Sequence, residues 1–200
     1  YKFILAIDEC YSDIYRMNKP KPPGGLEAAL NLGSGLENLI IFNSLSKRSN
    51  ACGMRAGFIV GDDTIIEKYK LLVSNGASPV PIPIQKVASA LYDDDKHQIE
   101  GCLHYDKNFE IAEKYLKPFY KDFKIPDAGF FLWLKVNDDK KAAITLWEKF
   151  SLRVMPGSFM AKDVNGTNPG KGYLRISLVD KKEVIEETMR RICLFLKTDV

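Results

Sequence analysis

The sequence predicts an α/β protein, with a mainly parallel sheet covered by helices and a smaller α/β layer after it. Short apolar runs at residues 3–7 and 38–43 are typical of parallel strands that are buried on both faces. Segments with helical periodicity lie between such runs. After Pro126 a new series of strand and helix patterns begins, which indicates a second layer starting near residue 93.

The first part of the chain alternates between strand and helix patterns. Prolines and glycines at 19–25, and prolines at three of the six positions 78–83, predict a loop and a rigid connector. Asp62 or Asp63 is placed to cap the helix that follows. The expected strands are 3–7, 38–43 and 56–60, the expected helices are 26–32, from 62 or 63 to about 73, and 84–92, and residues 44–53 form a turn.

The second part begins with a long amphipathic helical region at about 96–120. The apolar positions that we expect to face its core are Ile99, Leu103, Phe109, Ala112, Leu116 and Phe119. Strands are expected at 130–136, 152–155 and 173–178, and helices at 140–150 and 181–196. The predicted domains are therefore 1–92 and 93–200.

Composition narrows the class of function. The 200 residues are 46% hydrophobic and 28% charged, as in ordinary globular proteins. The net charge of +3 comes from scattered basic residues, so no surface for nucleic acid or for an acidic membrane is predicted. Four cysteines lie far apart, and the two histidines have no ligand cluster beside them, which argues against a zinc site. We expect free, mostly buried thiols in a reducing cytoplasm.

The apolar runs bear on membrane insertion and on whether the chain is a piece of a longer protein. No run approaches the roughly 20 residues that a membrane helix needs. The chain opens without methionine on a run that requires neighbouring strands and covering helices, and these neighbours are hard to find downstream. We therefore expect the sequence to be a piece of a longer, cytoplasmic protein.

Polar residues gather where predicted strands end. Asp8 and Tyr11 follow the first strand, Ser44, Ser46 and Lys47 follow the second, and Arg55 lies eight residues after the lysine. In an open parallel sheet the carboxyl ends of strands form a crevice for ligands. A lone lysine in a serine-rich turn is usually only solvated, so the joint pattern carries the prediction.

This pattern of D-x-x-Y, then S-x-S-K, then arginine resembles the fold-type I aminotransferases of classes I and II. The string NPGKGYLRISLV adds Arg175 where such enzymes carry the arginine for the substrate carboxylate. The resemblance covers essentially the whole chain. It implies the C-terminal part of the large domain that binds pyridoxal 5'-phosphate over 1–92, and a small C-terminal domain over 93–200.

The family chemistry implies a role for each residue at the first two motifs. Lys47 is expected to form the internal imine with pyridoxal phosphate and then to act as general base and acid. Asp8 would keep the pyridine nitrogen protonated, because a carboxylate beside it favours the cationic form. Tyr11 would donate a hydrogen bond to the phenolate oxygen of the cofactor.

Anionic groups on cofactor and substrate imply the remaining roles. Arg55, with the hydroxyls of Ser44 and Ser46, is expected to bind the cofactor phosphate. For Ser46 an ordinary turn residue is an equally open interpretation. Arg175 is expected to bind the substrate α-carboxylate from the face of its strand opposite to Leu174; the alternative is a strand arginine that pairs with a surface acid.

Several strings resemble one group of aminotransferases more closely. DECYSDIY, SLSKRSN, VMPGSF and NPGKGYLRISLV look like the N-succinyldiaminopimelate aminotransferases of bacterial lysine biosynthesis. The resemblance implies amino transfer between glutamate and N-succinyl-2-amino-6-oxopimelate, ping-pong kinetics, and a homodimer of the full-length chain. Arg48 could bind a further substrate carboxylate or be a solvated neighbour of the lysine. The phosphate loop and the ring-stacking aromatic of such enzymes have no counterpart in this sequence.

Other functions share features with this sequence. Another class I or II aminotransferase, a regulator domain that binds the cofactor without turnover, and a purely structural fragment all remain open. The S-x-x-K motif that starts at Ser44 also occurs in serine acyltransferases, but their partner motifs are incomplete here. Residues 33–35 begin like a dinucleotide loop, yet they precede a strand, so we expect a turn.

Overall fold

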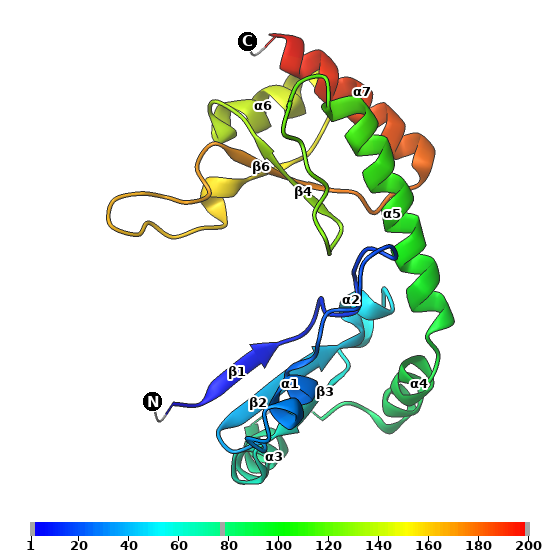
Figure 1. The fold of residues 1–200 in the computed structure, drawn as a ribbon, viewed down its shortest axis with the longest axis vertical. Coiled ribbons are helices and arrows are strands. Elements are labelled where there is room, and N and C mark those ends of the chain that lie inside the picture. Colours follow the sequence, from blue (N-terminus) through cyan, green and yellow to red (C-terminus); the bar gives the residue numbers. More distant parts are fainter. Residues whose placement is uncertain (1–2, 77–78, 199–200) are drawn as a thin grey trace. The chain divides into compact units, whose positions relative to one another are not determined.

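A computed structural model describes residues 3–76 and 79–198 of the chain (Figure 1). The contacts divide the chain into two compact units, Tyr1–Cys102 and Leu103–Val200. This division falls later than the boundary expected at residue 93. The helix α5 (Lys96–Leu116) runs through it, and the first turns of α5 bind the first unit, because Gln98 and Cys102 both donate hydrogen bonds to the carbonyl of Asp13.

The first unit is built on a three-stranded sheet in the order β1-β2-β3. Its elements are β1 (Leu5–Asp8), α1 (Gly25–Asn31), β2 (Leu39–Ser44), α2 (Leu45–Arg48), the 3-10 turn η1 (Cys52–Met54), β3 (Gly57–Gly61), α3 (Asp63–Gly76), α4 (Ile82–Tyr92) and the start of α5. The strands β1 and β2 are parallel, but β2 and β3 are antiparallel. The α/β class is confirmed, and the part of the sheet in this chain has one parallel and one antiparallel pair among the described residues.

Burial differs between the two parallel strands. Residues Leu39, Ile40 and Ile41 of the central strand β2 are buried, as expected. Within this chain β1 is less buried than β2: Leu5 is 48% exposed, and among the described residues only β2 is hydrogen-bonded to this strand. A small core of Ala29, Leu39 and Ile41 covers the side of the sheet that α1 packs against.

Local chemistry explains the ends of several elements in this unit. Asp62 caps α3, because its Oδ1 accepts a hydrogen bond from the backbone N–H of Thr64 at 2.8 Å. The connector predicted at 78–83 is shorter than expected, since α4 already begins at Ile82 with Pro83 in its first turn, where no backbone donor is needed. Residues 77–78 lie outside the described part. The expected turn at 33–35 is confirmed, with positive φ at both glycines.

A close approach between β2 and β3 requires glycine at the start of β3. A Cβ at Gly57 would lie 2.2 Å from the carbonyl oxygen of Asn43, well inside van der Waals contact. The absence of a side chain at Gly57 therefore lets β3 pair with the end of β2, next to the predicted lysine turn.

The second unit is a small α/β layer on an antiparallel sheet in the order β4-β6-β5. Its elements are the rest of α5, β4 (Phe131–Lys135), α6 (Asp139–Phe150), β5 (Met155–Pro156), the 3-10 turn η2 (Gly157–Phe159), β6 (Tyr173–Ser177) and α7 (Lys182–Thr198). The helices α5 and α7 lie beside each other (Figure 1), where the thiol of Cys193 contacts the carbonyl of Tyr115. The core between helices and sheet includes Leu146, Leu174 and Met189, all fully buried.

The buried face of α5 is shifted from the expected one. Phe109, Ala112 and Leu116 are fully buried as predicted, and Phe119 is partly buried beyond the helix end. The predicted burial of Ile99 and Leu103 is wrong, since these residues are 38% and 44% exposed. The buried stripe instead continues through Cys102 and Gln98 at spacings of three and four residues. A polar residue lies on that stripe because its amide binds the carbonyl of Asp13.

All four thiols are free, but only Cys102 is buried; Cys10 and Cys193 are half-buried and Cys52 is exposed, so mostly buried thiols were wrongly expected. Within residues 3–76 and 79–198, every helix is too short or too polar to cross a bilayer.

Asp139 holds both ends of the segment between η2 and β6. Its carboxylate is buried and accepts hydrogen bonds from the backbone N–H of Ser158 at 2.9 Å and of Gly172 at 3.2 Å. Burial alone would raise the pKa of Asp139, but the hydrogen bonds from Ser158 and Gly172 outweigh it and leave the pKa below its ordinary value. The ionised carboxylate therefore stabilises the loop that leads into β6.

We expect Asp139→Asn to lower the free energy of unfolding by about 1–3 kcal/mol, because backbone donors lose a charged acceptor. Urea unfolding of the purified protein measures this loss. The exposed Asp163→Asn in the same loop is the matched control and should change stability by less than about 0.5 kcal/mol. In the parent protein the contribution of Asp139 is complete above the ordinary carboxyl pKa and disappears as the pH falls through the lowered folded value. Equal losses in the two variants would contradict this role.

Candidate active site

Strand register brings three of the predicted motifs to one edge of the first sheet. In the parallel pair Asp8 lies opposite Phe42, so the carboxyl ends of β1 and β2 meet at the same edge. The antiparallel β3 starts there, with Gly57 opposite Ser44. Arg55 therefore lies just before β3, in keeping with the strand expected at 56–60. An antiparallel third strand is what brings Arg55 back to the edge that carries Asp8 and Ser44.

The lysine turn is a short helix that grows directly out of β2. Ser44 is the N-cap of α2, and its Oγ accepts a hydrogen bond from the backbone N–H of Ser46 at 3.1 Å. The two hydroxyl oxygens of Ser44 and Ser46 lie 3.0 Å apart. Ser46 thus takes part in the local turn and also lines the cavity described below, so both interpretations of this residue stay open.

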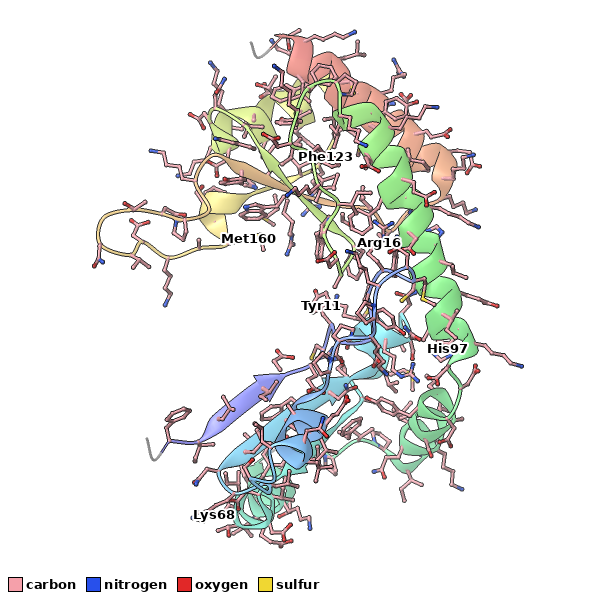
Figure 2. All side chains as sticks on the ribbon, viewed as in Figure 1. Tyr11, Arg16, Lys68, His97, Phe123 and Met160 are labelled. Atoms are coloured by element: carbon pink, nitrogen blue, oxygen red, sulfur yellow. The ribbon has the colours of Figure 1, made fainter. Side chains whose placement is uncertain are left out.

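The amine of Lys47 meets the segment that follows β1. Its Nζ lies over the ring of Tyr11, 5.7 Å from the ring centroid (Figure 2 labels Tyr11). This contact joins the D-x-x-Y and S-x-S-K motifs in space, although 36 positions separate the two residues in the sequence. Tyr11 is 43% exposed, so its ring presents a surface to which a ligand has access.

Cys10 lies among the predicted residues and was missed by the sequence reasoning. Its backbone N–H donates to Oδ1 of Asp8 at 3.0 Å. Hydrogen bonds from the Cys10 thiol and backbone hold the pKa of Asp8 below its ordinary value, so the carboxylate is ionised at neutral pH. Burial, with the charge of Asp8, raises the pKa of the Cys10 thiol, against the opposing influence of Ser44 and Lys47. The only signal in the sequence was its place inside D-x-x-Y.

A cavity of about 530 Å³ opens beside this edge. Polar groups of Cys10, Ser44, Ser46 and Arg55 line one part of it. Most of the remaining wall is apolar, from residues that include Phe42, Phe58, Ile59, Ile66 and Val73, and it also carries Asn43, Tyr69 and Lys70. Arg55 adopts a left-handed backbone conformation with φ +52°, and its Nη1 donates to the carbonyl of Cys52 at 3.0 Å. The cavity therefore combines hydroxyl donors and one exposed guanidinium, which suits an anionic group.

Arg48 fits neither of the two roles considered for it. Its side chain is only 7% exposed, so it is not a solvated neighbour of Lys47. Its Nη2 donates to Oδ1 of Asp95 at 2.6 Å and to the carbonyl of Tyr92 at 3.3 Å. With its fork directed at protein acceptors, Arg48 is part of the internal structure behind the lysine turn.

Arg175 belongs to the second unit and lies on the strand β6. Leu174 and Ile176 are buried beneath it, which confirms that its side chain lies on the opposite face. Its guanidinium lies 4.4 Å from the ring centroid of Phe131, and Trp133 is its antiparallel partner. Among the residues that the structure describes, Arg175 forms no salt bridge, so the pairing with a surface acid that the sequence left open is not found.

Comparisons with known proteins show the family to which this chain belongs. The family model described as aminotransferase class I and II matches residues 1–192. A crystal structure of an aminotransferase from Neisseria meningitidis Z2491 superposes with a TM-score of 0.90 at 40% identity, over 98% of this chain and 50% of that one. Aminotransferase AspB from Helicobacter pylori 26695 gives a TM-score of 0.84 at 32% identity, over 98% and 50%.

Two curated relatives differ in what they act on. An LL-diaminopimelate aminotransferase from Natranaerobius thermophilus is 30% identical over 96% of this chain and 48% of its own length. The 4-dedimethylamino-4-oxo-anhydrotetracycline transaminase OxyQ from Streptomyces rimosus is 27% identical over 94% and 50%. The chain thus spans about half the length of the relatives it matches, and it belongs to the class I and II aminotransferases, a family of pyridoxal-phosphate-dependent transaminases.

Proposed function

We propose that this chain is the C-terminal half of a pyridoxal-phosphate-dependent aminotransferase in which Lys47 is the catalytic amine. The observation that carries the proposal is the position of the Lys47 amine over the Tyr11 ring, at the sheet edge where Asp8 and Ser44 also lie. An isolated lysine in a turn would show no such surroundings. The homodimer and the remaining cofactor contacts are proposed for the full-length protein.

The residues at this edge fit the cofactor group by group. Pyridoxal phosphate supplies, when bound, an electron sink for the bonds around the substrate Cα. Asp8 is ionised and would hold a pyridine nitrogen in its protonated form. The Ser44 hydroxyl and the Arg55 guanidinium face the cavity and would bind the phosphate, while the Tyr11 hydroxyl would donate to the phenolate oxygen.

The remaining roles concern protons and the substrate. The amine of Lys47 would hold the cofactor in the resting protein and, once free, would act as base and acid for the proton at the substrate Cα. Arg175 would bind the α-carboxylate with its planar fork. The aromatic rings beside Arg175, Phe131 and the stacked pair Trp133 and Tyr173, would exclude water from that ion pair.

For the substrate we propose glutamate as amino donor and N-succinyl-2-amino-6-oxopimelate as acceptor, a reaction of lysine biosynthesis. The strings around Asp8, Lys47 and Arg175 support the succinylated substrate, and the LL-diaminopimelate aminotransferases among the relatives support a substrate of the diaminopimelate type. The alternative is another class I or II aminotransferase, because the family also includes a tetracycline transaminase at similar identity. A domain that binds the cofactor without turnover is the non-enzymatic alternative.

Borohydride reduction of the protein with bound pyridoxal phosphate should place a phosphopyridoxyl group on Lys47. Peptide mapping by mass spectrometry identifies the modified residue, and Lys47→Ala should lose both the label and transamination. Lys68→Ala is the matched control, since Lys68 is an exposed lysine on α3 and its loss removes the same charge. A label that persists at another residue in Lys47→Ala would overturn the assignment.

Asp8→Asn should lower kcat/KM by about 100- to 1000-fold, the usual loss when a charged group that stabilises the transition state is removed. Asparagine keeps the size of the side chain but cannot favour a cationic pyridine nitrogen. Steady-state transamination assays measure the effect, with the exposed Asp163→Asn as control for the loss of one negative charge. Near-parental kinetics in Asp8→Asn would remove Asp8 from the site.

A panel of amino donors and 2-oxo acids tests the substrate. We expect the highest kcat/KM for glutamate with N-succinyl-2-amino-6-oxopimelate, and parallel double-reciprocal plots, because the amino group is stored on the cofactor between two half-reactions. Turnover of other pairs alone would favour the general aminotransferase. Cofactor binding with no turnover of any pair would favour the regulator.

A further inference from the structure

The residues on both sides of Lys47 are fixed by one segment, residues 92–98, which we call the α4–α5 junction. On one side, the hydroxyl of Tyr92 donates to Oδ1 of Asn43 at 3.0 Å. On the other side, Nε2 of His97 lies 2.8 Å from Oγ of Ser49 (Figure 2 labels His97 at the start of α5). The junction therefore binds the lysine turn at two points, one before Lys47 and one after it.

Arg48, the next residue after Lys47, makes the central contact of the junction. Its Nη2 donates to Asp95 at 2.6 Å and to the carbonyl of Tyr92 at 3.3 Å, and its guanidinium carbon lies 5.7 Å from the centroid of the Tyr92 ring. Burial raises the pKa of Tyr92 to about 12, so its hydroxyl keeps the proton that it donates to Asn43.

The same arginine reaches the segment after β1. Its Nε lies 3.9 Å from Oδ2 of Asp13, which follows the Asp8 and Tyr11 motif by two residues. The carbonyl of Asp13 also accepts hydrogen bonds from the Gln98 amide and, at 3.4 Å, from the Cys102 thiol. The junction and the start of α5 thus contact both motifs of the candidate site. Arg48, which lies in the lysine turn, contacts the junction and also the segment that follows β1.

Stability alone is a poor reason for a buried arginine at this position. Its side chain is 7% exposed, and its Nη1 is buried without a hydrogen-bond partner among the described residues. Its partner Asp95 is 77% exposed, so solvent screens the attraction between the two charges, while the buried arginine still bears the cost of desolvation. What an apolar residue could not do is fix the distance between two separate loops through directed hydrogen bonds.

We propose that Arg48 is a positioning residue, which fixes the Lys47 amine relative to the segment that contains Asp8 and Tyr11. It does so through its contacts with Asp13, Tyr92 and Asp95. The inference rests on the proposed function and deepens it. Arg48 would contact neither cofactor nor substrate. Its loss would disturb the alignment of the amine while leaving the groups that bind cofactor and substrate in place.

Two substitutions separate this role from a merely structural one. In the full-length protein with bound pyridoxal phosphate, Arg48→Met should lower kcat by about 10- to 100-fold, the size of effect that a small misplacement of a reacting group produces, with little change in KM. The visible circular dichroism of the bound cofactor should weaken, because it reports the orientation of the ring. Arg48→Lys should recover part of both signals, since it keeps the charge but lacks the fork.

Arg190→Met is the matched control, because Arg190 pairs with Glu187 on the exposed face of α7 and its loss removes the same charge. It should leave kcat and the dichroism band unchanged. The inference is overturned if Arg48→Met keeps the parental kcat and the parental dichroism band. It is also overturned if the loss of kcat only follows the fraction of unfolded protein. If the parent protein shows no borohydride label at Lys47, the proposed function fails as well, whereas a labelled parent with an unaltered Arg48→Met overturns this inference alone.

Discussion

The register of a three-stranded sheet is the constraint on which the candidate site depends. The strands β1 and β2 pair in parallel, and β3 returns antiparallel to β2, so one edge receives the end of two strands and the start of a third. A shift of one residue in either pairing would turn Asp8 or Ser44 to the other face of the sheet. Gly57 secures the β2 and β3 pairing, because no larger residue fits against the carbonyl of Asn43.

The candidate site combines an anionic carboxylate with cationic and hydrogen-bond-donating side chains. Asp8 is kept ionised by the Cys10 backbone and thiol, and the amine of Lys47 lies over an aromatic ring whose face attracts cations. Hydroxyl and guanidinium donors lie at the cavity beside them. A cofactor with a cationic ring and an anionic phosphate matches this separation of charge, which is why the geometry supports the proposed transamination better than serine acyl transfer.

Polar contacts hold in place the segments that carry the candidate site residues. Arg48 and the α4–α5 junction hold the lysine turn, and Asp139 holds the loop that leads to β6 in the other unit. In both places a charged side chain binds segments that are far apart in the sequence. Such contacts contribute direction as well as energy, so they determine where a neighbouring side chain points.

The sequence by itself determined the α/β class, most helices and strands, and the motif that resembles the class I and II aminotransferases. Apolar periodicity and the spacing of Asp8, Lys47 and Arg55 are local properties, and local properties can be seen in a single chain. The roles of the site residues remain predictions. The family itself rests on the match over residues 1–192.

Only the tertiary structure decided the direction of β3, the buried stripe of α5 and the place of Arg48. Each depends on partners that are remote in sequence: β2 for β3, the carbonyl of Asp13 for Gln98, and the acceptors on Tyr92 and Asp95 for the arginine. A charged residue next to a lysine is expected on the surface until its acceptors are known. Burial of polar groups is therefore decided by the packing of distant segments, because only their hydrogen bonds offset the cost of desolvation.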